Sequence, residues 1–549
     1  MSIKVPVAVA IVSSVLPLAA MTGDVAQTMP QEPQIVDGRL VYPEGVPVPA
    51  TMTETEQRWL DSMNAPVVRG ATPPSSDPIR CASEYEPMDG IVLAWEGGSS
   101  FTNIVAQMAA QITTIGNGNV YVACDSNNEA NSARNSMVNQ GADASRIFTV
   151  VRSTDTIWIR DYGPRYIFEG GCRAVVDHDY NRPRPNDDAF NEYFAGWIGH
   201  GYYRLPLTHG GGNYHANSIG DGAATELINN ENPQLTQAEI WQLWKDYQNV
   251  DTIFHTPFPT SVDSTQHIDM WMQIIGDQEI IISDWPSHSG STQDDICDDA
   301  AAWYASQGWT VYRVPAYTSG WTHYTFTNMV ICNDLVLLPK YNSISSYWSA
   351  DALDAVQAAM PDRTVVQIVC DNLAYSAGVM HCISMHVPAN AGGANPVAYL
   401  REPRGGDVWE PGDSVLIRWN SDDDVSATSA DILLSTDGGA SYDTVIVSGT
   451  ADDGFHSWLV PDLDSDSVRI KVVVRDADGN TGSDAGDGDS EIIGTEVPGD
   501  VTGDGQVGVD DLLVVIGDWA CSGSCTGDAN DDGSVGVDDL LIVIANWGG

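Results

Sequence analysis

Basic residues are scarce in this sequence. Only 24 of the 549 residues are Lys or Arg, whereas 75 are Asp or Glu, and the formal net charge is −51. A surface this acidic repels phosphate backbones and anionic lipid headgroups, so the composition argues against nucleic-acid binding and membrane-surface binding. The same surface attracts cations, which leaves metal ions and cationic substrates as the favoured ligands.

Long apolar segments are also scarce. One follows Lys4 near the start and runs for sixteen residues, from Val5 to Ala20. This pattern predicts a secretory signal peptide over residues 1–22, and therefore a secreted protein. A transmembrane anchor is the alternative, but sixteen residues interrupted by two prolines are short for a membrane span. No later segment of the sequence is long and apolar enough to span a membrane.

Nucleotide-binding motifs are missing as well. The glycines of "HGGGNYHANSIGDG" (209–222) could cradle a phosphate, but no Lys with Ser or Thr completes a P-loop there. A GxGxxG strand–helix unit does not fit either. We interpret this stretch as a tight active-site turn.

Nine cysteines are present, which is an odd number for a chain directed to an oxidising compartment. Cys521 and Cys525 lie close together in "CSGSC" and could form a disulfide. Seven cysteines remain, so at least one thiol should stay unpaired. That thiol is a candidate for chemistry.

Changes in composition divide the chain into five parts. Residues 23–78 contain Pro, Thr and Met with little periodicity, and a helix is predicted near Glu54–Met63. Short apolar strands then alternate with helical stretches, which indicates an α/β domain. Alternating strands with Gly, Asp and Pro in the turns follow, and they indicate an immunoglobulin-like β-sandwich. The predicted boundaries are 1–22 for the signal peptide, 23–78 for a linker or pro-segment, 79–390 for the α/β domain, 396–494 for the sandwich and 497–549 for a repeat-containing tail.

The tail contains an internal repeat. "GDVTGDGQVGVDDLLVVIGDW" (499–519) recurs as "GDANDDGSVGVDDLLIVIANW" (527–547), and each copy is an acidic loop followed by an apolar helix. Each loop has oxygen-bearing side chains and a glycine at the spacing of a small α-helical calcium module. A solvated acidic turn would explain one copy, but two copies with the same final acid and helix favour calcium. The candidate ligands are Asp500, Thr502, Asp504, Gln506 and Asp511 in the first loop, and Asp528, Asn530, Asp532, Ser534 and Asp539 in the second.

The two loops resemble a dockerin-type pair, in which the last ligand is Asp rather than the Glu of a sensor EF-hand. The resemblance implies two bound Ca²⁺ ions and docking to a cohesin-like or cell-surface partner. Thr502 is an atypical third-position ligand, so we expect the first loop to bind calcium more weakly.

Polar residues interrupt four otherwise apolar stretches of the α/β domain. They are Trp158, Arg160 and Asp161 in "TIWIRDYGPRYI" (156–167), His267 and Asp269 in "TQHIDMWMQII" (265–275), Asn328 in "HYTFTNMVICN" (323–333), and Cys382 in "SAGVMHCISMHVP" (376–388). We expect His267 and Asp269 to lie on one face of a strand, because side chains two apart share a face. We expect Cys382 to lie in a glycine-led turn into a strand.

Each of these residues also has a structural explanation. The Arg–Asp pair could be an ion pair, His267 could be a core histidine, and Cys382 could be a buried small side chain or half of a disulfide. Together they supply a nucleophilic thiol, a proton-transfer group and two carboxylates. Acyl transfer would need an oxyanion hole, in which two acids would be misplaced. Two carboxylates can instead hold a guanidinium while a thiolate attacks its carbon, with His267 protonating the departing ammonia and then activating water.

Two arginines stand out in the stretch "YNRPRPNDD" (180–188). Arg182 and Arg184 are each followed by a proline, which restricts the backbone of the residue before it. Such stiffened arginines suit the binding of an anionic group.

A family resemblance is carried by seven stretches between residues 79 and 390. They are "SEYEPMDGIVLAW" (83–95), "IWIRDYGP" (157–164), "YNRPRPNDD" (180–188), "HGGGNY" (209–214), "HID" (267–269), "TNMVICN" (327–333) and "HCIS" (381–384). In this order they resemble the bacterial, Porphyromonas-type peptidylarginine deiminase and agmatine deiminase family, which hydrolyses C–N bonds of amidines. The resemblance implies a five-bladed, pseudosymmetric α/β propeller of the pentein type, and catalysis without a cofactor.

The resemblance also assigns roles to single residues. The implied roles are nucleophile for Cys382, general acid and base for His267, guanidinium ligand for Asp161 and Asp269, supporting residue for Asn328, packing on the substrate for Trp158, and binding of the carboxylate of a C-terminal arginine for Arg182 and Arg184. One departure concerns Ser264–Gln266, which stand where the peptidylarginine branch has an aromatic residue before the histidine. We therefore expect a different pocket rim.

The sequence thus predicts a secreted deiminase that converts arginine, at the C terminus of a peptide or protein, to citrulline and ammonia through a covalent thiouronium intermediate. Agmatine has no carboxylate, so paired arginines would serve no purpose in an agmatine deiminase, which is the first alternative. The second alternative is a non-catalytic protein that binds a surface through its calcium loops.

Overall fold

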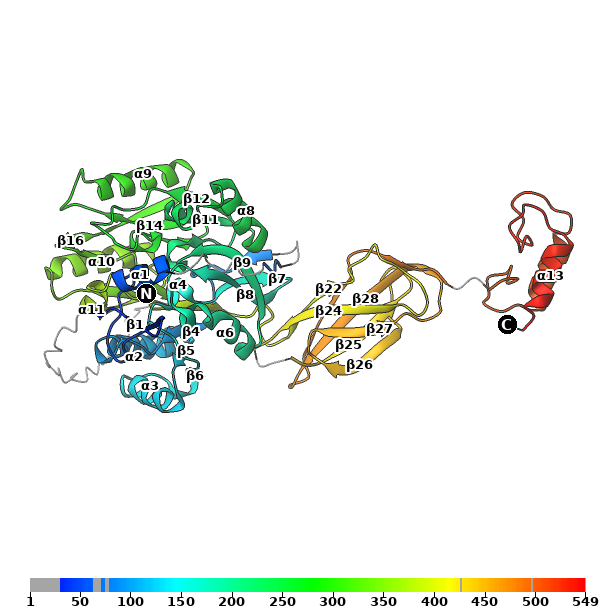
Figure 1. Ribbon diagram of the computed structural model, residues 1–549, viewed down its shortest axis with the longest axis horizontal. Helices are drawn as coiled ribbons and strands as arrows, with labels where there is room; N and C mark the ends of the chain where they lie inside the picture. Colours follow the sequence, from blue (N-terminus) through cyan, green and yellow to red (C-terminus); the bar gives the residue numbers. More distant parts are fainter. Residues whose placement is uncertain (1–29, 63–70, 75–78, 425–426, 495–496, 549) are drawn as a thin grey trace, which may run out of the picture.

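The computed structural model describes residues 30–62, 71–74, 79–424, 427–494 and 497–548, and the predicted signal peptide lies outside these residues. Figure 1 shows an α/β body, a β-sandwich and a small helical body, in that order along the chain. Across the described ranges, every helix is too short or too polar to cross a membrane.

The α/β body is built from five small sheets of similar design, counted over the described residues. Two sheets have four strands, here in their order across the sheet: β21 (Met385–Pro388), β4 (Met88–Ala94), β5 (Asn119–Cys124) and β6 (Ile147–Val151) in one, and β3 (Ile79–Cys81), β7 (Arg165–Glu169), β8 (Cys172–Tyr180) and β9 (Gly201–His209) in the other. Two three-stranded sheets follow in the chain: β10 (His215–Ala216), β11 (Asp221–Thr225) and β12 (Asp251–His255), and then β13 (Met272–Gly276), β14 (Glu279–Asp284) and β15 (Thr310–Pro315). The fifth sheet contains β18 (Val330–Cys332), β19 (Leu335–Lys340) and β20 (Thr364–Val369).

Each sheet combines an antiparallel pair with a parallel neighbour. A helix lies between the two parallel strands in the chain, because a parallel pair needs a crossover connection. These helices are α2 (Ser99–Thr114), α6 (Phe190–Ile198), α8 (Gln237–Gln248), α9 (Thr292–Ser306) and α10 (Ser346–Ala359). The observed elements confirm the mixed α/β prediction. Five repeats of one design are what a five-bladed propeller requires, although the propeller itself stays a prediction.

The two ends of the α/β body meet in one sheet. Strand β21, at its C-terminal end, pairs antiparallel with β4, near its N-terminal end. Strand β4 is buried on both faces and holds the layers on its two sides together. Its residues Ile91 and Leu93 join one hydrophobic cluster, while Val92 and Ala94 join another on the opposite face.

Shorter elements connect these repeats. They are α3 (Asn127–Asn139), α4 (Ile159–Tyr162), α5 (Pro185–Asp188), α7 (Leu227–Glu231), α11 (Asp371–Ala374), β16 (Tyr317–Ser319) and β17 (Thr322–Tyr324). Before the α/β body, the chain forms the strand pair β1 (Gln34–Val36) and β2 (Arg39–Val41), and then helix α1 (Glu54–Ser62). Helix α1 confirms the helix predicted near residue 54.

One predicted strand is divided in the structure. The apolar stretch 329–339 forms two antiparallel strands, β18 and β19, that are joined at Asn333. Asn333 adopts a positive φ of 52°, a conformation that asparagine tolerates in tight turns. Its side-chain amide also donates to the carbonyl of Met88, which ties the turn to β4.

The second body consists of two sheets that share one core. One sheet contains β22 (Val397–Glu402), β24 (Ser414–Asp422) and β27 (Phe455–Leu459); the other contains β23 (Val408–Trp409), β30 (Ser490–Ile492), β28 (Ser465–Asp476), β25 (Ala427–Ser435), β26 (Thr444–Ala451) and β29 (Thr481–Ala485). Side chains from both sheets, such as Trp419 and Ile432, are buried between them. A buried ion pair joins this body to the first, with Nη2 of Arg173 2.8 Å from Oδ1 of Asp422. The immunoglobulin-like assignment stays a prediction.

The third body contains helices α12 (Val509–Gly517) and α13 (Val537–Ala545), each after an acidic loop, as the repeat predicts. Equivalent valines of the two copies, Val515 and Val543, are buried in one small core. Cys521 and Cys525 form the predicted disulfide. The other seven cysteines are reduced and buried.

Candidate active site

The predicted site residues lie in short turns that precede one strand of each sheet. These turns are α4 before β7, a 3₁₀ turn at Gly211–Asn213 before β10, a 3₁₀ turn at Ile268–Met270 before β13, the segment of Asn328 before β18, and the turn of Cys382 before β21. Because each sheet presents the same end in this way, five distant segments of the chain converge on one buried place.

The expected strand position of His267 and Asp269 is wrong. Asp161 lies in the single-turn helix α4, and Asp269 lies in the 3₁₀ turn that His267 precedes. Strand β13 begins only at Met272. The side chain of Asn213 accepts a hydrogen bond from the backbone N–H of Ile268, which fixes this turn in place of an extended strand. The predicted glycine-led turn at Cys382 is confirmed.

His267 and Asp161 form a buried pair. Nδ1 of His267 lies 3.3 Å from Oδ1 of Asp161, which also accepts a hydrogen bond from the N–H of Gly212. Burial by itself lowers the pKa of His267, but the carboxylates of Asp161 and Asp269 outweigh it and raise the pKa to about 9. His267 is therefore an imidazolium at neutral pH, ready to donate a proton from Nε2.

Cys382 lies beside the second carboxylate. Its Sγ is 3.2 Å from Nδ2 of Asn328 and 3.6 Å from Oδ2 of Asp269. Burial raises the pKa of the Cys382 thiol, and Asp269 and Asp161 raise it further because they repel a thiolate. The thiol is therefore neutral before a cation binds. Asn328 also accepts a hydrogen bond from the N–H of His381, which fixes the backbone next to Cys382.

Two polar atoms of the site are buried without a hydrogen-bond partner in the described structure. They are Nε2 of His267 and Oδ1 of Asp269. These two atoms are therefore free to hydrogen-bond a bound ligand. A hydrogen-bond donor for Asp269 and an acceptor of the His267 proton are what a guanidinium and its departing ammonia supply.

The absence of a side chain at Gly212 lets the catalytic groups approach one another. A Cβ atom at this position would lie 2.8 Å from Nδ1 of His267, 2.9 Å from Oδ1 of Asp161 and 3.0 Å from Oδ2 of Asp269. Each distance is too short for a real contact. The glycines of "HGGGNY" therefore form the tight active-site turn that the sequence predicts.

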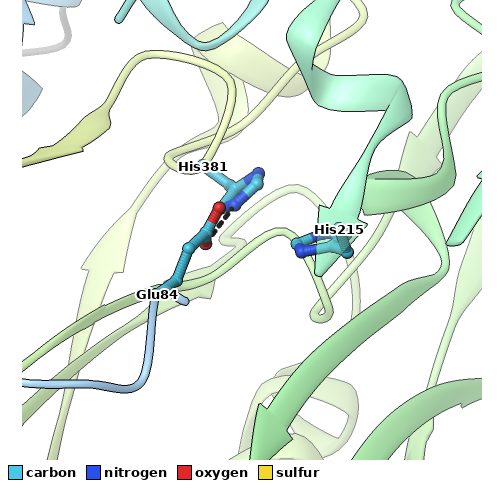
Figure 2. A group of neighbouring side chains, drawn as sticks. All are labelled: Glu84, His215 and His381. Carbon is cyan, nitrogen blue, oxygen red and sulfur yellow. Dashed lines mark hydrogen bonds and ion pairs between the residues drawn. The ribbon is translucent and has the colours of Figure 1, made fainter. Parts of the chain in front are cut away.

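A buried chain of charges lies behind Asp269, and its members were missed as site residues. Oδ2 of Asp269 is 2.8 Å from Nδ1 of His381, whose Nε2 is 2.8 Å from Oε2 of Glu84, as Figure 2 shows for the second pair. Arg160 is ion-paired with Glu84. Both Glu84 and His381 fall inside stretches that carry the family resemblance, and this position in the sequence could have identified them as site residues.

The same group could suggest a metal site, because atoms of Glu84, His215 and His381 lie within 4.8 Å of one another. However, both ring nitrogens of His381 are already hydrogen-bonded to carboxylates. The Arg160 guanidinium also holds Glu84 and would repel a cation there. The arrangement is better suited to fixing the position of Asp269 than to binding a metal.

The other predicted substrate residues contact the N-terminal segment of this chain. Trp158 is fully buried, and its Nε1 donates a hydrogen bond to the carbonyl of Val48. Arg184 is also fully buried, and its Nε lies 2.8 Å from Oε1 of Glu56. Arg182 is partly buried and lies within electrostatic reach of Asp161 and His267. A substrate carboxylate can reach Arg184 only after Glu56 leaves, and the substrate roles of these residues stay predictions.

The first acidic loop of the third body brings three of its predicted ligands together. Carboxylate oxygens of Asp500, Asp504 and Asp511 lie within 4.8 Å of one another. The hydroxyl of Thr502 donates to Asp511 at 2.8 Å and so lies in the same cluster. In the second loop, Asp539 accepts a backbone hydrogen bond from Asn530 at 3.2 Å. Gln506, Asp528, Asp532 and Ser534 belong to the same two loops, and this all-oxygen donor set fits Ca²⁺.

Comparisons with known proteins agree with this geometry. Residues 80–388 match the family described as Porphyromonas-type peptidyl-arginine deiminase. A Vibrio parahaemolyticus protein named "Putative agmatine deiminase" is 24% identical over 377 residues, covering 58% of this chain and 99% of that protein. The structure of the agmatine deiminase of Enterococcus faecalis has a TM-score of 0.51 at 20% identity, covering 60% of this chain and 100% of that chain.

The family match spans more than half of the chain and contains every residue of the buried site. Deiminases of this family need no cofactor for catalysis. The protein therefore belongs to the Porphyromonas-type peptidyl-arginine deiminase family and is a hydrolase of C–N bonds in guanidino groups, in class EC 3.5.3.

Proposed function

We propose that this protein is a secreted deiminase of arginine at the C terminus of peptides or proteins. The observation that carries the proposal is the convergence of Cys382, protonated His267 and two carboxylates on one buried site, with Arg182 within electrostatic reach. The carboxylates suit the guanidinium end of the substrate, and Arg182 suits its carboxylate end.

The proposed reaction begins when the guanidinium binds between Asp161 and Asp269. Its positive charge offsets the two carboxylates that keep the Cys382 thiol neutral, so the thiol releases its proton to solvent. The thiolate sulfur then forms a bond with the central guanidinium carbon. His267 donates its proton to the departing amino group, the C–N bond breaks, and ammonia leaves behind a thiouronium.

The second half of the reaction restores the enzyme. Neutral His267 accepts a proton from water as the water oxygen bonds to the thiouronium carbon. The C–S bond breaks, the sulfur of Cys382 takes the electron pair and the proton of the added hydroxyl, and a ureido group is released with the thiol restored. The net change is guanidinium and water to ureido product and ammonium, so peptidyl arginine becomes citrulline.

Agmatine is the second candidate substrate, and a specific observation favours it. The donors of Arg184 are directed to Glu56, to backbone carbonyls and to the Tyr180 hydroxyl, so they are already engaged and a substrate without a carboxylate does not need them. Named relatives of the chain are also agmatine deiminases. In this case the product would be N-carbamoylputrescine.

One experiment decides between the candidates. The purified protein is incubated with agmatine, free arginine, a peptide that ends in arginine and a peptide with internal arginine, and ureido product and ammonia are measured. We expect the highest kcat/KM with the peptide that ends in arginine, and no turnover by Cys382→Ala. Arg182→Gln should raise KM for that peptide by about tenfold or more, because one charge-assisted contact is lost, and should leave KM for agmatine nearly unchanged. Turnover of agmatine alone would contradict the proposal.

We further propose that the protein is exported and held at a cell surface. The apolar start of the sequence supports export, and the disulfide between Cys521 and Cys525 is typical of an oxidising compartment. The clustered oxygens of the first acidic loop, and the repeat of the same ligand pattern in the second, support two Ca²⁺ sites in a dockerin-like module, which would dock to a cohesin-like or cell-surface partner. We expect calcium to have a structural role in this module.

A further inference from the structure

The strap, defined as residues 45–56, runs from an irregular segment into the first turn of α1 and contacts Trp158, Arg182 and Arg184, the residues predicted to bind the substrate. It precedes the part of the chain that matches the family, which begins at residue 80. Figure 1 draws α1 and β1, in blue, within the outline of the α/β body. The strap follows β2 in the chain and includes the first residues of α1.

Backbone groups of the strap are bound at successive residues. Trp158 Nε1 donates to the carbonyl of Val48 at 2.8 Å, Arg184 Nη2 donates to that of Pro49 at 2.8 Å, and Arg182 Nε donates to that of Ala50 at 3.3 Å. The N–H of Ala50 in turn donates to the carbonyl of Ser376 at 3.0 Å.

The side chains of Trp158, Arg184 and Arg182 thus bind main-chain carbonyls of the strap. Hydrogen bonds to consecutive main-chain groups are the usual way in which a protein binds an extended peptide. Val48 and Ala50 are buried in this contact, and Ala50 packs in the same hydrophobic cluster as Trp158. The surface around Trp158 is therefore a built peptide-binding site with an occupant from its own chain.

The strap also supplies a carboxylate. Glu56 is fully buried, and its Oε1 lies 2.8 Å from Nε of Arg184. Burial raises the pKa of Glu56, but the Arg184 guanidinium outweighs burial and lowers it, so the carboxylate is charged. Arg184 thus binds an intramolecular anion at the place where a substrate carboxylate is expected.

The catalytic groups are closed off in this arrangement. The exposed fractions are 2% for Cys382, 1% for His267, 2% for Asp161 and 1% for Asp269. A peptide cannot reach such groups without displacing part of the surface above them. The strap holds the three residues assigned to the substrate, so a peptide that binds these residues must displace it.

We propose that the strap is an intramolecular competitor of the substrate, and that the site it occupies binds an extended peptide with a nearby carboxylate. This inference rests on the proposed peptide deiminase function and adds its regulation. Displacing the strap frees Trp158, Arg182 and Arg184 for a peptide substrate and opens a path to Cys382.

Two full-length variants loosen the strap without changing the catalytic residues. Ala50 is only 1% exposed, so Ala50→Arg forces a long charged side chain into a buried position. Glu56→Gln removes the charge that pairs with Arg184 and keeps the side-chain shape. Glu54→Gln is the matched control, because it removes the same charge from the same helix at an exposed position.

Two readouts are measured on each variant. The first is kcat/KM for a peptide that ends in arginine. The second is the rate of alkylation of Cys382 by iodoacetamide, followed by peptide mass spectrometry. Cys332 and Cys370 have no exposed area, and their unchanged alkylation shows that the variant stays folded.

We expect Ala50→Arg and Glu56→Gln to increase both kcat/KM and the rate of Cys382 alkylation by at least about tenfold. Glu56→Gln breaks a buried charge pair of the strap, and Ala50→Arg disrupts a buried contact, so each weakens the binding of the strap. Glu54→Gln should resemble the unchanged protein. If neither variant accelerates alkylation of Cys382, the inference is wrong. If alkylation accelerates but no variant deiminates any substrate, the strap inference stands and the proposed function fails. If the unchanged protein is active and neither variant is faster, the proposed function stands and the strap inference is wrong.

Discussion

Replacing Asp161 with Asn should lower the pKa of His267 sharply. The ordinary histidine value is 6.5, and the folded protein raises the value for His267 to about 9. This difference corresponds to about 3.4 kcal/mol in favour of the imidazolium. Asp161 supplies the larger part of it, since its carboxylate lies 3.3 Å from Nδ1 of His267, while burial acts in the opposite direction. Asparagine keeps the shape and a hydrogen bond but removes the charge.

The expected value in Asp161→Asn is below 6.5, because the burial of His267 is then opposed mainly by Asp269. The assay is a pH titration of protein labelled with ¹³C in its histidine rings, with the His267 signal identified by its loss in His267→Gln. His255 is an internal reference, because burial alone lowers its pKa to about 4 and the substitution should not change it. A pKa of His267 that stays within about 0.5 of the native value would refute the electrostatic argument.

The pairing of His267 with Asp161 should also make the stability of the protein depend on pH. A group whose pKa is raised on folding stabilises the protein below its unfolded pKa, and this contribution is lost as the pH rises through the folded pKa. The free energy of unfolding should therefore fall between about pH 6.5 and about pH 9. In Asp161→Asn this part of the pH dependence should be absent. Chemical denaturation at several pH values measures both curves.

Three further substitutions test other parts of the structure. Gly212→Ala should reduce kcat/KM by about a hundredfold or more, because its Cβ would displace the catalytic side chains, whereas Gly196→Ala, with nothing within 4 Å, should have no effect. His381→Asn can still donate to Asp269 and should retain more activity than His381→Gln, and equal activities would refute a positioning role. Asp504→Ala combined with Asp532→Ala should lower Ca²⁺ affinity in calorimetry and leave deimination unchanged, and a loss of both would show that calcium acts on the catalytic site.

The sequence by itself determined the elements and most of the chemistry. Residues near one another in the chain reveal periodicity, turns and loops, so the alternating strands and helices, the repeat of the tail and the disulfide at Cys521 were all predictable. That Cys382, His267 and the two carboxylates lie in one site was also predictable, because these groups make chemical sense together, and their catalytic roles stay a prediction. The backbone around His267 was predicted wrongly, since a strand pattern cannot show that Asn213 fixes a turn there.

Only the tertiary structure decided which distant groups meet. Glu84 and His381 are 297 residues apart in sequence, and no local pattern indicates that one orients the other behind Asp269. Glu56 and Arg184 are 128 residues apart, so the sequence could show an anion-binding arginine but not that its anion comes from the same chain. The physical reason is that a buried charge requires a partner, and the fold rather than the sequence neighbourhood decides which group is brought to it.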